Sequence, residues 1–241
     1  MNTVTARFLL FFLPATLVSN LVRFNVVSTS LTGGAQIDDI LRILGESIAV
    51  AMFAVIAMTM LKRQRSLGVS LLGKSPVHVI AAAIATLVLY IYLNRGAVEL
   101  TALLLLATAS FIYALFEETG WRGYLFAEFR HNTLWFQVLV PGGLWYLWHL
   151  SFLQTTAIEA NLTFLAICLA ASWGLYGVVN STRSILAAAT LHFAFGAVFT
   201  NQILKGFWAA PNQWIFLVGA FAISLIAIKQ YERRSAKLAS A

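Results

Sequence analysis

Two acids and a base stand together in one apolar stretch of the sequence, at Glu117, Glu118 and Arg122. On an α-helix Glu118 and Arg122 share a face, because they are four residues apart, and they can form an ion pair. Glu117 points about 100° away around the helix and has no local partner. A lone carboxylate of this kind suits a general base, whereas the pair is typical of a structural tie.

Two histidines lie in separate apolar stretches, His149 at the end of WYLWH and His192 at the start of HFAFG. Either histidine alone fits the common role of a packed core residue. Two such histidines and the carboxylate of Glu117, on three different stretches, instead predict one shared site. The set could activate a water molecule or hold a zinc ion with an open coordination position, and the residues leave both alternatives open.

The stretches that carry these side chains are those of a membrane protein. Of the 241 residues 60% are hydrophobic and 10% are charged, against about 45–50% and about 25% in soluble domains. Apolar runs near the roughly 20 residues that cross a bilayer predict helices, not the alternating strands of a barrel. We therefore expect an all-α, polytopic transmembrane bundle of about eight spans. The expected spans are 8–22, 43–61, 77–93, 101–119, 134–152, 163–179, 184–204 and 214–228.

Small residues and a proline interrupt two of these spans. Straight helices need not bring the lone acid and the first histidine to the same depth in the bilayer. Gly120 and Gly123 therefore predict a broken or re-entrant helix near 120–133, and Pro141-Gly142-Gly143 predicts a bend in the fifth span.

The basic residues predict the orientation in the cell membrane. With eight spans, 11 of the 16 Lys and Arg residues fall on one side and 4 on the other, with Arg122 set aside as intramembrane. Because cytoplasmic loops are the basic ones, both termini are expected in the cytoplasm. The net charge of +7 is explained in this way, so nucleic acid is not an expected partner. We expect one integral membrane domain over 1–241, with a catalytic core at 110–204 and a basic cytoplasmic tail at 229–241.

The motifs resemble those of the CAAX protease and bacteriocin-processing (CPBP, or Abi) family of intramembrane proteases. That family's signature is EExxxR, then an aromatic residue four positions before a histidine, then HxxxN or HxxxD. The matching segments here are EETGWRGYLF at 117–126, WYLWH at 145–149 and HFAFG at 192–196. The resemblance covers about 85 residues and implies a multispan helical hydrolase that carries out intramembrane proteolysis.

The resemblance also implies a role for each residue of the site. Glu117 would activate water as the general base, assisted by His149. His192 would stabilise the oxyanion or take part in water activation, and Glu118 with Arg122 would hold the site together. Members are often described as metalloproteases, which would make Glu117, His149 and His192 the zinc ligands, and a metal-free mechanism is the alternative.

Two positions depart from the family pattern. Trp145 stands where Phe is usual, and Gly196 stands where Asn or Asp is usual. The resemblance implies that the missing side chain binds the developing oxyanion, and the loss of one such donor costs about 10²–10³ in rate. Asn201 lies nine residues beyond His192, roughly on the opposite helix face, and Asn180 could take part only by way of a loop.

Three hypotheses follow. The first is an endopeptidase that cleaves a membrane-associated or lipid-anchored peptide or protein within a cavity open to the cytoplasm. The second is a catalytically degenerate scaffold or immunity protein, because of Gly196. The third is an ion or solute transporter that uses Glu46, Glu117 and the histidines as a path. A prenylated CaaX end, a bacteriocin leader and a membrane-protein segment all stay open as substrates.

Overall fold

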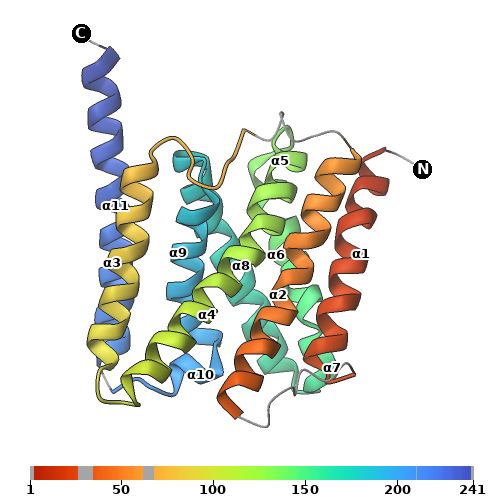
Figure 1. Cartoon of the computed structure of the whole chain (residues 1–241). Helices are drawn as coiled ribbons and strands as arrows, with labels where there is room; N and C mark the ends of the chain where they lie inside the picture. The colour runs from red at the N-terminus through yellow and green to blue at the C-terminus, as the bar shows by residue number, and fades with distance from the viewer. Residues whose placement is uncertain (1–2, 27–34, 62–67, 210, 240–241) are drawn as a thin grey trace.

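The computed structural model of the chain describes residues 3–26, 35–61, 68–209 and 211–239, and regular structure within these ranges is helical (Figure 1). The helices that run along the bundle are α1 (Thr3–Arg23), α2 (Ala35–Met60), α3 (Pro76–Asn94), α4 (Leu100–Glu118), α6 (Leu134–His149), α8 (Ile158–Thr182), α9 (Ile185–Phe195) and α11 (Asn212–Ala239). The shorter pieces are η1 (Thr119–Leu125), α5 (Phe126–Phe129), α7 (Ser151–Gln154), η2 (Gly196–Thr200) and α10 (Gln202–Lys205).

The predicted all-α membrane bundle is confirmed. Five of the described helical stretches are long and apolar enough to cross a membrane, and two shorter apolar ones cover Phe8–Arg23 and Ile185–Thr200. Together with α6 they account for the eight predicted spans. The five longer stretches are Ile40–Met60, Pro76–Asn94, Leu100–Phe129, Ile158–Thr182 and Asn212–Arg233.

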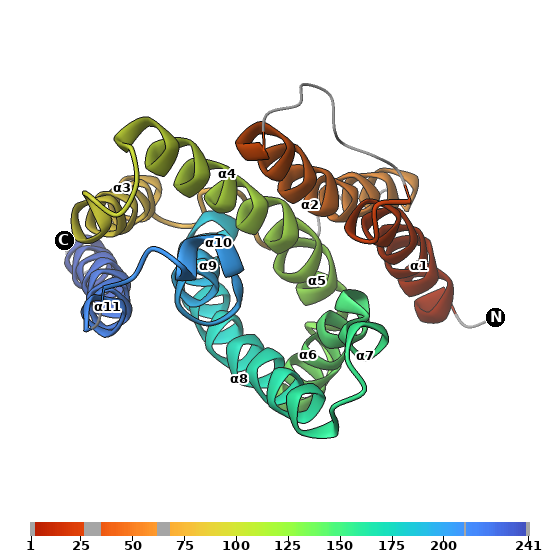
Figure 2. The same ribbon diagram turned by 90° about the horizontal axis from the view of Figure 1, so that it is seen from below.

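Helix α9 and the end of α4 that carries the acidic motif lie in the interior of the bundle (Figure 2). Helix α4 packs between α2 and α9, and α9 in turn contacts α3, α8 and α11. One apolar cluster joins α1, α2, η1, α6 and α8, and a second joins α3, α4, α9 and α11. Both the acidic motif at the end of α4 and the second histidine on α9 therefore lie where the two clusters meet.

The predicted break in the fourth span takes the form of a π-helix. The wider turn of η1 follows Glu118 directly, and π-helical turns of this kind are frequent at functional sites. The helical path continues through η1 into α5 and ends at Phe129, so it does not turn back as a separate helix. Helix α6 runs through Pro141 as a single element.

The start of α9 is held by residues 68–75, the described end of the polar connector before α3. The Ser70 amide donates a hydrogen bond to the Arg183 carbonyl at 3.0 Å. The Ser184 hydroxyl, which also caps α9, donates to the Leu71 carbonyl at 2.9 Å. This docking fixes the beginning of the helix that carries the second histidine.

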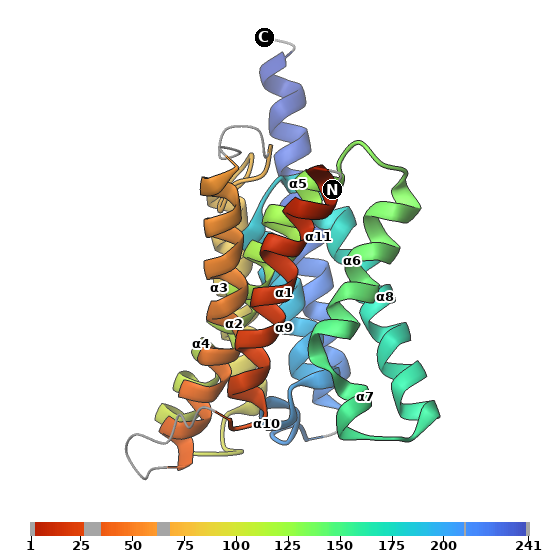
Figure 3. The same cartoon turned by 90° about the vertical axis from the view of Figure 1, so that its right-hand side faces the viewer.

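The first turn of α1 and the last turns of α11 lie at the same end of the bundle (Figure 1). Helix α11 projects beyond the other helices there (Figure 3), and the predicted basic tail continues it as far as Ala239. An even number of crossings requires this arrangement. Which side of the membrane that end faces stays a prediction.

We predict that Gly120→Ala destabilises the bundle by about 1–3 kcal/mol, a common cost of overpacking a core. A Cβ at this position would lie 2.5 Å from Val50 Cγ1 and 2.7 Å from Phe11 Cζ. Thermal unfolding in detergent measures the effect. Gly143→Ala is the matched control, because an added Cβ there meets nothing within 4 Å. Equal unfolding temperatures for the two variants would contradict the close approach of η1 to α1 and α2.

Candidate active site

A buried network joins the acidic motif to the second histidine. Arg122 Nη1 donates to Glu118 Oε1 at 3.0 Å, so the pair predicted from the helical spacing is formed. His192 Nδ1 lies 2.8 Å from the same oxygen. Glu118 is fully buried, Arg122 is 3% exposed and His192 is 7% exposed. Since a carboxylate bound to arginine accepts hydrogen bonds, His192 Nδ1 carries the proton, and in the neutral ring Nε2 keeps its lone pair.

Glu117 is fully buried beside this network. Its Oε2 accepts a hydrogen bond of 2.8 Å from Trp145 Nε1 and lies 4.0 Å from His192 Nε2. That last distance is too long for a direct hydrogen bond and is one that a bridging water can span. Glu117 Oε2 and His192 Nε2 are both acceptors, so a water molecule between them would donate a hydrogen to each.

His149 reaches the same region from the end of α6. Its Nδ1 lies 2.8 Å from the carbonyl oxygen of Trp145, which can only accept, so Nδ1 is again the protonated nitrogen. The ring packs edge-on against Phe164, at 4.9 Å between centroids. Of the three predicted side chains, Glu117 and His192 are therefore brought together, and His149 joins them through Trp145.

A cavity of about 290 Å³ lies next to these side chains, among α1, α2, α4, α6, α8 and α9. His192, His149 and Trp145 line it. Helix α4 contributes residues up to Ala114 to the lining, and Glu117 follows one turn later. The wall is mainly apolar, which suits a hydrophobic ligand. The apolar and aromatic lining includes Ile43, Phe164, Ile167, Phe195, Phe199 and Leu204.

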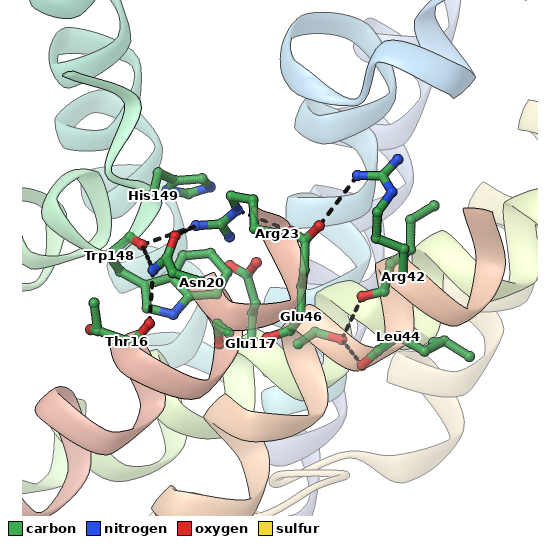
Figure 4. Close-up of polar contacts among 12 residues, drawn as sticks. Thr16, Asn20, Arg23, Arg42, Leu44, Glu46, Glu117, Trp148 and His149 are labelled. Atoms are coloured by element: carbon green, nitrogen blue, oxygen red, sulfur yellow. Dashed lines mark hydrogen bonds and ion pairs between the residues drawn. The ribbon is translucent and has the colours of Figure 1, made fainter. Parts of the chain in front are cut away.

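Charged residues line one end of the cavity (Figure 4). Arg23 Nε donates to Glu46 Oε2 at 3.1 Å, and Arg42 Nη1 donates to Glu46 Oε1 at 3.3 Å. Arg23 Nη1 also donates to the Trp148 carbonyl at 3.0 Å, and its guanidinium stacks on that ring. The sequence assigned both arginines to loops. The expected span 43–61 contains Glu46, and a carboxylate inside the membrane was the signal that basic partners lie close by.

The cavity lies toward the end of the bundle away from the termini. Arg23 ends α1, and α10, which directly follows Asn201, lies at the end of the bundle opposite to the start of α1 (Figure 1). The sequence predicted cytoplasmic termini together with a cavity open to the cytoplasm. The two predictions cannot both hold, because the cavity and the termini lie at opposite ends of the bundle.

Asn201 lies closer to the site than its spacing predicted. The placement on the far helix face assumed a regular α-helix, but η2 is π-helical and turns less per residue. Asn201 consequently lines the cavity and donates to Ser110 Oγ at 3.1 Å. Ser110 precedes Glu117 by seven residues, about 10 Å along α4, so Asn201 does not take the place of the side chain missing at Gly196. Asn180 is exposed on α8.

The predicted zinc ligands do not converge on one point. Among the residues that the structure describes, no three His, Cys, Asp or Glu side chains lie close enough to hold a metal ion. Trp145 lies between two of the predicted ligands: its indole N–H donates to Glu117 Oε2, and its main-chain carbonyl holds His149 Nδ1. The donor set therefore does not fit zinc in this arrangement.

A family model matches the middle of the chain, over residues 98–198. Its description is type II CAAX prenyl endopeptidase, Rce1-like. The matched stretch runs from the turn before α4 into η2, and it contains all three motifs. A comparison with curated proteins finds no match. The family match confirms the resemblance that the motifs carry.

We predict that Arg122→Gln costs about 3–5 kcal/mol of stability, because it leaves Glu118 buried without its cation. The double variant Glu118→Gln/Arg122→Gln has no uncompensated charge and should lose less. Thermal unfolding of the two proteins in detergent compares them. A double variant as unstable as the single one would show that the pair is not the tie between α4, η1 and α9.

Proposed function

We propose that this chain is an intramembrane endopeptidase, because residues 98–198 match the Rce1-like family model of type II CAAX prenyl endopeptidases. It hydrolyses a peptide bond of a membrane-associated or lipid-anchored peptide or protein. Glu117 is the general base in this proposal. The observation that carries it is the 4.0 Å separation between Glu117 Oε2 and His192 Nε2, which accommodates one water molecule between two acceptors.

The reaction is addition of that water to the scissile carbonyl, followed by loss of the amine. Glu117 takes a proton as the water oxygen bonds to carbon, and returns it to the leaving nitrogen as the C–N bond breaks. His192 Nε2 accepts a hydrogen bond from the second O–H of the water. This contact orients the lone pair of the water oxygen toward the scissile carbonyl. When the His192 ring is neutral, Nε2 offers no N–H to the cavity, and this supports water activation over oxyanion binding for His192.

His149 assists from the cavity wall. Its Nδ1–H is held by the Trp145 carbonyl, so that Nε2 is the nitrogen left to accept a hydrogen bond. Glu118 and Arg122 fix His192 and do not meet the substrate. The family match also implies a prenylated substrate, and the apolar wall of the cavity supports a hydrophobic ligand. The low dielectric of such a cavity strengthens each of these polar contacts.

We predict that Glu117→Gln lowers the cleavage rate by about 10²–10⁴, the usual contribution of a general base. The assay uses purified protein in detergent and a quenched fluorescent peptide that ends in a prenylated CAAX sequence. Glu99→Gln is the control, because Glu99 is an exposed carboxylate that caps the other end of α4. Equal cleavage rates for the Glu117→Gln protein and the wild type would contradict the proposal.

A catalytically degenerate scaffold is the second candidate, and Gly196 favours it. Gly196 lines the cavity four residues after His192, where the family usually supplies an amide or a carboxyl group. Neither histidine, when neutral, donates an N–H to the cavity, so the histidines do not replace the missing donor. A scaffold would keep its biological function in the Glu117→Gln variant at normal protein level, whereas a protease would lose it.

We predict that Gly196→Asn raises the cleavage rate about 10-fold or more, because one oxyanion donor is worth about 10²–10³ in a well-formed site. The space exists, since an added Cβ would have Thr200 Oγ1 at 3.8 Å and no closer contact. The same peptide assay measures the gain. Gly196→Ala is the control and adds the Cβ without a donor. If Asn and Ala give the same rate, this position does not supply the missing donor.

A further inference from the structure

Trp145 contacts four of the five side chains predicted for the site. Its indole N–H donates to Glu117, and its main-chain carbonyl accepts from His149, each at 2.8 Å. The ring lies edge-on to His192 at 4.9 Å between centroids, and the Arg122 guanidinium lies 4.8 Å from the ring centre. Tyr113, one turn earlier on α4, is a second hydrogen-bond partner of Glu117, so Trp145 supplies the donor that reaches this carboxylate from another helix.

The indole N–H is the part of Trp145 that a phenylalanine cannot replace. Phe is the residue usual at this position in the family that the motifs resemble, and its ring could pack on His192 without donating. The pairing is also specific to this tryptophan. Trp121 and Trp148 are buried in the same core, and the indole N–H of each has no partner. A buried indole N–H in this bundle therefore does not always have a hydrogen-bond partner.

We propose that Trp145 is a positioning residue for Glu117, an inference that rests on the proposed function of that carboxylate. The N–H bond fixes the rotation of the carboxylate and keeps Oε2 directed toward His192 Nε2. Without the indole N–H, Glu117 keeps the contact with Tyr113 from its own helix but loses its hydrogen bond to α6, so the carboxylate is held less firmly in the rotamer that aligns the water. The Trp145 carbonyl fixes the His149 ring in the same way, which makes one residue responsible for the alignment of two.

The kinetic test is Trp145→Phe, which keeps the ring and removes the N–H. We expect kcat to fall about 10- to 100-fold, the effect of losing one hydrogen bond to a charged group. KM should change by less than about 3-fold, because the indole N–H faces the carboxylate and not the substrate. A merely structural role would alter the folded fraction and leave kcat per folded molecule unchanged.

Trp121→Phe is the matched control. Trp121 is 1% exposed, its N–H has no partner and it packs against Phe11, away from the cavity lining. The same chemical change is made there in an equally buried ring. We expect a kcat within about 2-fold of the wild type. If Trp145→Phe has the same kcat as Trp121→Phe, the proposal is overturned.

A second measurement needs no activity. The seven tryptophans give indole ¹H–¹⁵N resonances, and the peak lost in Trp145→Phe assigns this one. We expect it far downfield, as for a donor bound to a carboxylate, and we expect Glu117→Ala to move it upfield while the Trp121 peak stays in place. An unmoved Trp145 peak overturns the contact.

The two measurements separate the failure of this proposal from the failure of the proposed function. A wild-type protein that cleaves no peptide, but whose Trp145 resonance responds to Glu117→Ala, would contradict the protease and support the positioning contact. A protein that cleaves normally after Trp145→Phe would keep the protease and contradict the positioning role.

Discussion

The cost of leaving a charge unpaired in lipid governs the arrangement of this site. Glu118 and Arg122 are buried inside a membrane-spanning bundle, and their pairing on one helix face removes most of that cost. The pair also offers a carboxylate oxygen that His192 can bind from α9. One ion pair thus joins two segments that are 74 residues apart, and it places an imidazole next to the remaining acid.

The hydrogen bonds that hold the two histidines determine which ring nitrogen of each one faces the cavity. Because Glu118 and the Trp145 carbonyl are acceptors, each histidine must present Nδ1–H to the protein and, when neutral, Nε2 to the cavity. Both imidazoles then act as acceptors toward whatever the cavity holds. In that state the two imidazoles can take protons from water but offer no N–H to a new anion. Gly196 leaves this imbalance uncorrected, which is why the fate of the oxyanion decides between a protease and its degenerate relative.

Sequence reasoning succeeded where the determining interactions are local. The eight spans follow from the length of the apolar runs, and the Glu118–Arg122 pair follows from spacing along one helix. It failed for contacts between distant segments. The donor to Glu117 comes from 28 residues away, and its Trp145 was treated as a mild substitution. Asn201 was misplaced because nothing in the sequence distinguished the π-helical turns of η2 from α-helix.

The cavity also bears on the orientation of the chain. The charge count assigned four basic residues to the side away from the termini, but Arg23 and Arg42 line the cavity and bind Glu46. Only Arg95 and Lys205 then represent loop charge on that side, against the 11 on the other. The positive-inside bias becomes stronger, not weaker. If the termini are cytoplasmic, as this rule predicts, the charged end of the cavity faces away from the cytoplasm.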